Sequence, residues 1–283
     1  MHGSIPASAR TSSRVGIALV FAIAMSVTAA PAWAAPAFVK VIGTNSDGTS
    51  SNTTIPVTVP AAGVAAGNTV IVELAMDSSN VTVSCADSRG NSYTNDADVT
   101  NSNSGSARAV IFSATVGTAL VSGDAITVTF SGQVAPKAIS ALEFSGLVSG
   151  SGRLDKTASG ANNGTSMTTA STTTTSQADE LLIGAFAVRL KSVSFTAGSN
   201  YTGAGGVTMN LSPASNNVAA FPEYRIVSAT GAYLANGSNG GSTSTDWAAL
   251  ITTYKAVVAT PTPTATVTAT PTVTATGSAT CGA

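Results

Sequence analysis

Histidine, a frequent acid–base and metal-binding residue, occurs once in this chain of 283 residues, as His2. We expect His2 to be lost with an export signal, so the secreted product would carry no imidazole. This excludes a Ser-His-Asp triad, a Cys-His dyad and a histidine-bearing zinc site. Two cysteines cannot form a four-cysteine zinc site. The chemistry that remains is that of carboxylates, of calcium held by oxygen atoms, or of binding without catalysis, and we predict that the protein is not an enzyme.

Four glutamates could supply the carboxyl pair of a glycosidase: Glu73, Glu143, Glu180 and Glu223. Such a pair lies roughly 5 Å apart in retaining enzymes and roughly 6.5–9.5 Å apart in inverting ones. No spacing in the sequence singles out a pair, and alternation places Glu73 and Glu143 on the outward sides of their strands. Glu223 is spaced to form an ion pair with Arg225. We therefore expect surface carboxylates and no catalytic residue, with a carboxylate-dependent glycoside hydrolase as an alternative.

Oxygen-bearing side chains cluster in residues 95–105, NDADVTNSNSG. Asp96, Asp98, Asn101 and Asn103 offer the hard ligands that Ca²⁺ prefers. Their spacing is not that of an EF-hand loop, and Asp and Asn also fill ordinary turns. We expect no cofactor, with calcium in this loop as the alternative.

Sugar binding without catalysis would require exposed aromatic rings that stack on the sugar. Tyr201 and Tyr233 neighbour Gly- and Asn-rich segments, which predicts exposure. Trp247 begins a predicted strand, a position more typical of a core residue than of a sugar platform. These three residues are the candidates for carbohydrate binding, with polysaccharide or cell-surface components as partners.

The two cysteines differ in their surroundings. Cys85 lies in an apolar strand and Cys281 lies near the C-terminus. They could form a disulfide in an oxidising compartment. We favour a buried, free Cys85 and an exposed Cys281 that could join another chain.

The first 34 residues have the pattern of a signal peptide. Arg10 and Arg14 precede an apolar stretch over residues 15–27, and Ala32-Trp33-Ala34 fits the A-x-A cleavage pattern. We predict cleavage near Ala34 and a secreted, extracellular or cell-surface protein without a transmembrane helix in its mature chain. Twelve basic and thirteen acidic residues give no reason to expect nucleic acid as a partner.

Short runs of Val, Ile, Thr and Phe alternate with Gly, Asn, Ser and Asp clusters, which is typical of strands and turns. No convincing amphipathic helix is present, so the predicted fold over 35–257 is an all-β antiparallel β-sandwich, jelly-roll or immunoglobulin-like. Alternation predicts that Leu142 and Phe144 point inward and that Glu143 faces water. In the strand 69–76 it places four residues in the core: Val70, Val72, Leu74 and Met76. The predicted strands are 38–42, 54–59, 69–76, 81–85, 107–116, 125–130, 137–144, 180–190, 223–229 and 247–257.

The composition changes after residue 257. Residues 260–276 consist of Thr, Pro, Ala and Val alone, a composition that buries too little apolar surface to fold. We predict a disordered Thr/Pro-rich linker or stalk over residues 258–283.

Four patches carry a resemblance: CADSRGNSYT (85–94), ALEFSGL (141–147), DELLIG (179–184) and EYRIVSATGAY (223–233). They resemble a recurrent, poorly characterised β-sandwich module of secreted bacterial proteins. The tail is similar to the linkers of bacterial polysaccharide-degrading enzymes and cell-surface adhesins. The resemblance implies a fold and a location, and it implies no catalytic residue.

The leading functional prediction is a non-enzymatic extracellular or cell-surface module for attachment, adhesion or assembly. The alternatives are a carbohydrate-binding module or carboxylate-dependent glycosidase, and a surface-layer or filament subunit.

Overall fold

The computed structural model describes residues 35–49, 52–102, 107–189, 194–208, 217–240 and 244–257. The predicted signal peptide, the predicted linker, Asn103 and Cys281 lie outside these residues. Every strand pairing within them is antiparallel. The predicted all-β antiparallel sandwich is confirmed.

The described residues form sixteen strands and one short 3₁₀ helix. The first eight strands are β1 (Ala37–Asp47), β2 (Thr54–Thr58), β3 (Thr69–Asp77), β4 (Val83–Asp87), β5 (Thr94–Thr100), β6 (Ala107–Thr115), β7 (Ala125–Phe130) and β8 (Lys137–Ser145). The helix η1 (Gly150–Arg153) follows. The second eight strands are β9 (Leu154–Gly164), β10 (Ser166–Thr168), β11 (Asp179–Val188), β12 (Thr196–Ala197), β13 (Thr202–Gly203), β14 (Ala219–Ser228), β15 (Asn236–Ser238) and β16 (Thr245–Lys255).

The two sets of eight strands share one topology. In the first set, which we call repeat 1, the inner sheet has the order β1-β8-β3-β6-β5 and the outer sheet has the order β2-β7-β4. In repeat 2 the inner sheet has the order β9-β16-β11-β14-β13 and the outer sheet has the order β10-β15-β12. Adding eight to each strand number of repeat 1 gives repeat 2. Strands 1, 8, 3 and 6 in one sheet and 2, 7 and 4 in the other follow the order of a jelly roll.

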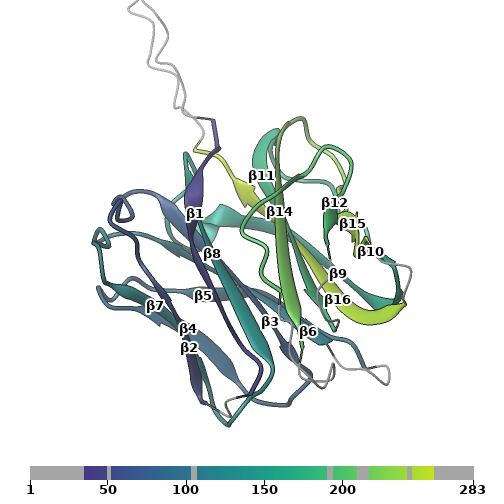
Figure 1. Cartoon of the computed structure of the whole chain (residues 1–283). Coiled ribbons are helices and arrows are strands. Elements are labelled where there is room, and N and C mark those ends of the chain that lie inside the picture. The colour runs from purple at the N-terminus through teal and green to yellow at the C-terminus, as the bar shows by residue number, and fades with distance from the viewer. Residues whose placement is uncertain are drawn as a thin grey trace, which may run out of the picture. The chain divides into compact units, whose positions relative to one another are not determined.

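The four sheets form successive layers, from the outer sheet of repeat 1 to the outer sheet of repeat 2 (Figure 1). Three apolar clusters fill the spaces between them. Within β3, Val72 and Leu74 point into the first space, as alternation predicts, whereas Ile71 and Ala75 point into the second, between the inner sheets. Both faces of β3 are therefore core, which explains why nearly all its residues are apolar.

The contacts between the inner sheets are related by a pseudo-two-fold axis. Strand β6 packs on β16 and β11, and β14 packs on β8 and β3. When the two repeats are exchanged, the β6–β16 contact becomes the β14–β8 contact, and the β6–β11 contact becomes the β14–β3 contact. The β3–β11 contact is unchanged by the exchange. This is the self-complementary geometry of a two-fold symmetric dimer, here built within one chain.

A buried polar cluster lies between the repeats. The carboxylate of Asp96 accepts hydrogen bonds from the hydroxyl of Ser113 and, at 2.7 Å, from that of Tyr254. Arg153 of η1 donates through Nε to Ser113 Oγ at 2.7 Å. Burial raises the pKa of Asp96. The cluster joins β5 and β6 of repeat 1 to β16 of repeat 2, and it includes the helix that links the repeats.

We expect Tyr254→Phe to lower the free energy of unfolding by about 1–2 kcal/mol, because Asp96 loses one donor in a buried site. Urea denaturation measures this loss. Tyr224→Phe is the control, since the Tyr224 ring stacks on Phe38 at 4.9 Å and its hydroxyl makes no hydrogen bond within the described residues. Equal losses in the two variants would contradict a role for the Asp96 hydrogen bond.

Three threonines fasten the segment between β10 and β11 to the segment before β15. Thr169, Thr172 and Thr175 donate their backbone N–H groups to the carbonyls of residues 235, 233 and 231. Each hydroxyl accepts the N–H of that same residue at 3.1–3.2 Å. All three threonines are buried. This ladder fixes the path of the chain into β15.

We expect Thr172→Val to cost about 1–2 kcal/mol, because it leaves the N–H of Tyr233 without its acceptor while conserving side-chain volume. Thermal denaturation compares it with Thr173→Val, since Thr173 is exposed one residue further along. A matching shift in the two midpoints would contradict the importance of the ladder.

Candidate binding surface

The four glutamates are buried rather than exposed. Glu73 is 2% exposed, Glu143 is 1% exposed, and Glu180 and Glu223 are fully buried. The prediction that Glu73 and Glu143 face water is wrong. Alternation could not place them in water, because both inner sheets are covered on both faces.

Glu143 serves as an anchor for neighbouring segments. It forms an ion pair with Lys40 Nζ of β1 at 2.6 Å. It also accepts hydrogen bonds from the N–H of Ala65 at 3.0 Å and from Asn68 Nδ2 at 2.7 Å. The carboxylate therefore holds the segment before β3 against β8 and β1.

Glu73 points into the space between the inner sheets. Neither of its carboxyl oxygens has a hydrogen-bond partner within the described residues. Burial raises its pKa well above the usual value, and the backbone amides of Phe186 and Phe221 oppose that rise only in part. Glu73 therefore lies within the core, out of reach of a large substrate.

Glu223 occupies the space left by a glycine on the neighbouring strand. It pairs in register with Gly184, and a Cβ at Gly184 would lie 2.7 Å from Glu223 Cγ and 2.9 Å from the Cβ of Ala235. One carboxyl oxygen accepts the N–H of Gly198 at 2.8 Å. Burial raises the pKa of Glu223 to about 7. The side chain thus supports the end of β12 from beneath the outer sheet of repeat 2.

The carboxyl groups of Glu180 and Asp155 have pKa values shifted in opposite directions. Burial raises the pKa of Glu180 to about 7, and Asp155 contributes to the rise. Burial also acts to raise the pKa of Asp155, but hydrogen bonds from Ser176 and Lys156 outweigh it and lower that pKa to about 2. Opposite shifts are typical of an acid and base pair. Here, however, Glu180 is fully buried, so it does not line a substrate cleft.

The residues considered for calcium have protein partners. Asp96 and Asp98 lie in β5 rather than in a loop. Asp98 forms an ion pair with Arg108 at 2.6 Å. Asn101 donates to the carbonyl of Asn162 at 2.8 Å and to that of Trp247 at 3.0 Å. No group of three or more His, Cys, Asp or Glu side chains that could hold a metal occurs in the part of the chain that the structure describes.

The structure brings Tyr201 and Tyr233 into one neighbourhood. The guanidinium of Arg225 lies 5.7 Å from the centre of the Tyr233 ring. Tyr201 donates to the carbonyl of Leu234 at 2.9 Å, and both rings are half-buried against the third apolar cluster. Trp247 is 4% exposed within that cluster. The arrangement provides no flat aromatic platform among these three residues.

Cys85 is half-buried and free of a disulfide within the described residues. Burial raises the pKa of its thiol, so Cys85 is a poor nucleophile.

The outer sheets expose polar groups that carry no charge. On repeat 1, Thr129 of β7 lies between Thr54 of β2 and Ser84 of β4. On repeat 2, Ser238 of β15 lies between Ser166 of β10 and Thr196 of β12. Each set forms a row of three hydroxyl groups across its sheet. The sequence carries a signal for these rows, because ITVTF and SMT alternate hydroxyl-bearing and apolar residues.

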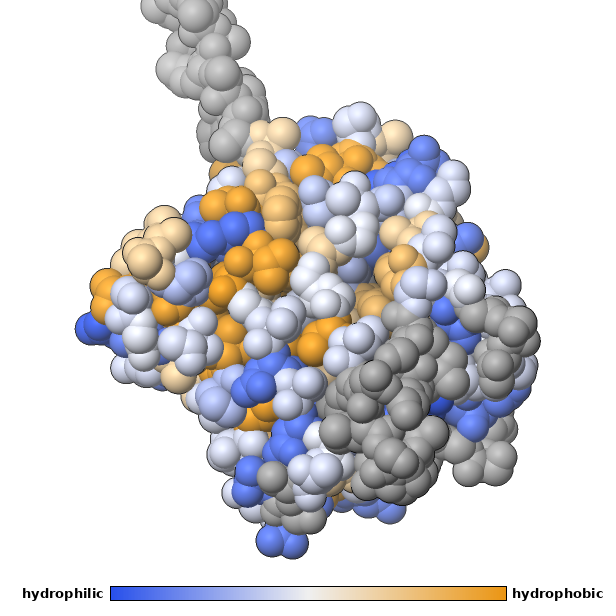
Figure 2. Space-filling model, viewed as in Figure 1, coloured by the Kyte–Doolittle hydropathy of each residue, from blue (hydrophilic) through white to orange (hydrophobic). Residues whose placement is uncertain are grey.

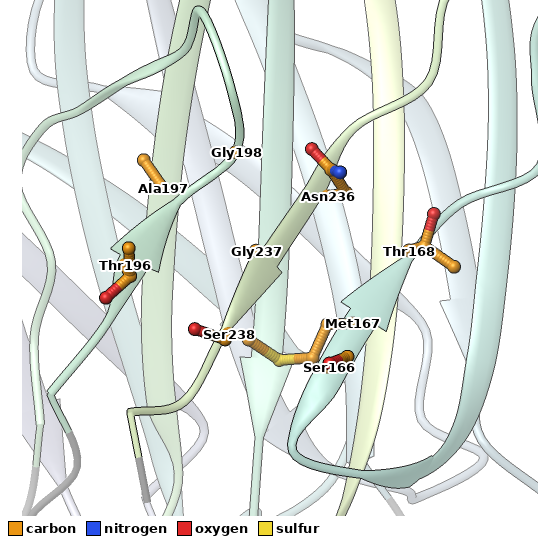
Figure 3. A pocket seen from close by; sticks show the side chains of 9 residues that line it. All are labelled: Ser166, Met167, Thr168, Thr196, Ala197, Gly198, Asn236, Gly237 and Ser238. Atoms are coloured by element: carbon orange, nitrogen blue, oxygen red, sulfur yellow. The ribbon is translucent and has the colours of Figure 1, made fainter.

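A depression of about 300 Å³ lies on the outer sheet of repeat 2. Figure 3 looks onto this sheet, with the strands of the inner sheet behind it. The lining contains no charged side chain, and Gly198, the residue held by Glu223, is part of it. The lining residues are Ser166, Met167, Thr168, Thr196, Ala197, Gly198, Asn236, Gly237 and Ser238. We name the two sheet surfaces the outer face of repeat 1 and the outer face of repeat 2.

Comparison with protein-family models, with curated proteins and with solved structures finds no match. Among the described residues, no helix has the length and apolar character needed to cross a membrane.

Proposed function

We propose that this chain is a non-enzymatic extracellular module that attaches to a neutral, hydroxyl-rich polymer such as a polysaccharide. Its location rests on the signal-peptide pattern of residues 1–34 and on the resemblance to modules of secreted bacterial proteins. Its mode of display rests on the Thr/Pro-rich composition of residues 258–283.

The observation that carries the proposal is the separation of charge from the outer faces. The four glutamates are withdrawn into the interior, whereas the outer faces expose hydroxyl and amide groups in rows. An uncharged face avoids the desolvation penalty of buried ions and can exchange hydrogen bonds with sugar hydroxyls.

The chain ends leave these faces free. Ala37 at the start of β1 pairs with Ser145, and the N–H of Val257 donates to the carbonyl of Gly146 at 2.9 Å. Both ends of the folded region therefore lie beside the end of β8 (Figure 1). A stalk that begins after residue 257 would leave the protein at this end of the strands.

Retention on insoluble cellulose, chitin and xylan tests the proposal, together with an assay for released reducing sugar. We expect retention on at least one polymer, insensitive to salt because no ion pair is involved, and no sugar release. Sugar release by the wild type that Glu180→Gln abolishes would instead establish a glycosidase. Absence of retention on every polymer, including those of a neutral glycan array, would overturn the proposal.

We also propose that attachment needs no calcium. The thermal midpoint and the retention on polymer should be the same with calcium and with a chelator, because Asp98 and Asn101 already bind protein groups. A chelator-induced fall in the midpoint would restore calcium as a cofactor.

Lateral assembly is a second candidate, favoured by apolar side chains along an edge strand. Val39 and Val41 of β1 are 43% and 36% exposed, and Figure 2 shows apolar residues gathered where β1 lies. Sedimentation of the wild type and of Val41→Lys over a range of concentrations tests it. Association of the wild type alone would support assembly, and two monomeric proteins would exclude it.

A further inference from the structure

We infer that the two outer faces are equivalent binding surfaces, so that one molecule bridges two strands of a neutral polysaccharide. The inference rests on the proposed function and extends it from attachment to cross-linking.

The two outer faces lie at opposite ends of the stack of four sheets. The layers run from outer sheet to inner sheet in repeat 1, and then from inner sheet to outer sheet in repeat 2. The pseudo-two-fold relation of the inner sheets turns the two outer faces in opposite directions. Within the described residues, no strand of either inner sheet covers an outer face, so two ligands could bind without touching each other.

Each outer face carries a row of three hydroxyl-bearing side chains. The row Thr54, Thr129 and Ser84 corresponds to the row Ser166, Ser238 and Thr196 under the eight-strand shift.

The next rows consist of Pro56, Thr127 and Ala86 on repeat 1, and of Thr168 and Asn236 on repeat 2. Neither face has a charged side chain in these rows. Within the described residues, these rows therefore offer a charged polymer no counter-ion.

The polar groups of the outer faces lie at the regular spacing of a β-sheet. Strands lie about 4.8 Å apart, and alternate residues along a strand lie about 6.7 Å apart. Each face presents one row of three hydroxyl groups, followed by a second row that contains Thr127 on repeat 1 and Thr168 and Asn236 on repeat 2, which suits an extended polymer with a hydroxyl group on every unit. Each hydrogen bond contributes little by itself, so binding depends on several in parallel, and two faces would add avidity.

Microcrystalline cellulose, chitin particles and xylan-coated beads serve as probes, with retention and particle clustering measured separately. The variants are Thr129→Lys on the outer face of repeat 1, Ser238→Lys on that of repeat 2, and both together. Thr157→Lys on the edge strand β9 is the matched control, because Thr157 is exposed and belongs to neither outer face. Circular dichroism and thermal denaturation establish that each variant is folded.

We expect the wild type and Thr157→Lys to cluster the particles on which they are retained. Each single-face variant should stay retained, with an affinity lowered by about tenfold or less, and should lose clustering. The double variant should lose retention.

Three results would overturn bivalency without contradicting attachment. In the first, one single-face variant abolishes retention and the other does not affect it. In the second, both single-face variants still cluster the particles, and in the third, the wild type is a dimer in sedimentation. A wild type that no probe retains would overturn attachment itself, and bivalency with it.

Discussion

Gly184→Ala is expected to lower the free energy of unfolding by about 2–3 kcal/mol, the upper part of the range for overpacking a filled core. The new Cβ would lie 2.7 Å from Glu223 Cγ, 2.8 Å from Glu223 Oε1 and 2.9 Å from the Cβ of Ala235. Strand β11 pairs on both sides, with β14 and β16, so its backbone has little freedom to move away. Displacing Glu223 would in turn weaken its hydrogen bond from Gly198.

Denaturant unfolding of Gly184→Ala, Glu223→Ala and the double variant measures this coupling. The double variant should cost less than the sum of the single variants, because removing the Glu223 side chain makes room for the new methyl group. Gly117→Ala is the control, since its Cβ would meet only Asn91 Oδ1 at an ordinary 3.7 Å. Additive costs in the cycle would show that the clash with Glu223 is not the cause.

Strands that carry apolar side chains could be predicted from sequence, including the edge strands β1, β2 and β4, and strands of mostly polar composition could not. Strand β3 and the predicted segment 69–76 agree to within one residue. Strands β5 and β9 were missed because their sequences, TNDADVT and LDKTASGANNG, are mostly polar. Both lie at an edge of an inner sheet and show few buried positions, so no hydrophobic alternation marks them.

The duplication is nearly invisible in the sequence because the repeats share topology more than residues. One trace is a Tyr-Thr pair at the fifth strand of each repeat: Tyr93 precedes Thr94, the first residue of β5, and Tyr201 precedes Thr202, the first residue of β13. The same limitation explains the error at Glu73, which points into the space between the inner sheets, whereas Glu143 lies on the face of β8 that repeat 1 itself covers. Alternation separates the two faces of a strand, but it cannot show that a second repeat covers the face expected to meet water. The outer faces could not be predicted as sugar-binding surfaces from aromatic residues, because their hydroxyl rows consist of Ser and Thr.

The free energy of unfolding is expected to fall as the pH rises from about 5 to about 7. Glu180 and Glu223 have folded pKa values raised from 4.5 to about 7, and burial also raises the pKa of Glu73 well above its usual value. Each group keeps its proton in the folded protein at a pH where the unfolded chain has released it. The stability that each contributes is therefore complete below pH 4.5 and is lost as the pH approaches the folded pKa. Asp155, with its pKa lowered from 3.8 to about 2, acts in the opposite direction and loses its contribution only in stronger acid.

The glutamine variants separate these contributions. Glu223→Gln should remove at most about 1.4 kcal/mol per pH unit from the slope between pH 5 and 7, the value for one proton, and should leave the slope above about pH 8 unchanged. Glu73→Gln should likewise weaken the fall of stability with rising pH, because burial raises the pKa of the Glu73 carboxyl. Urea denaturation in a series of buffers measures both profiles. A wild-type stability that rises between pH 5 and 7 would contradict the raised pKa values of Glu180 and Glu223.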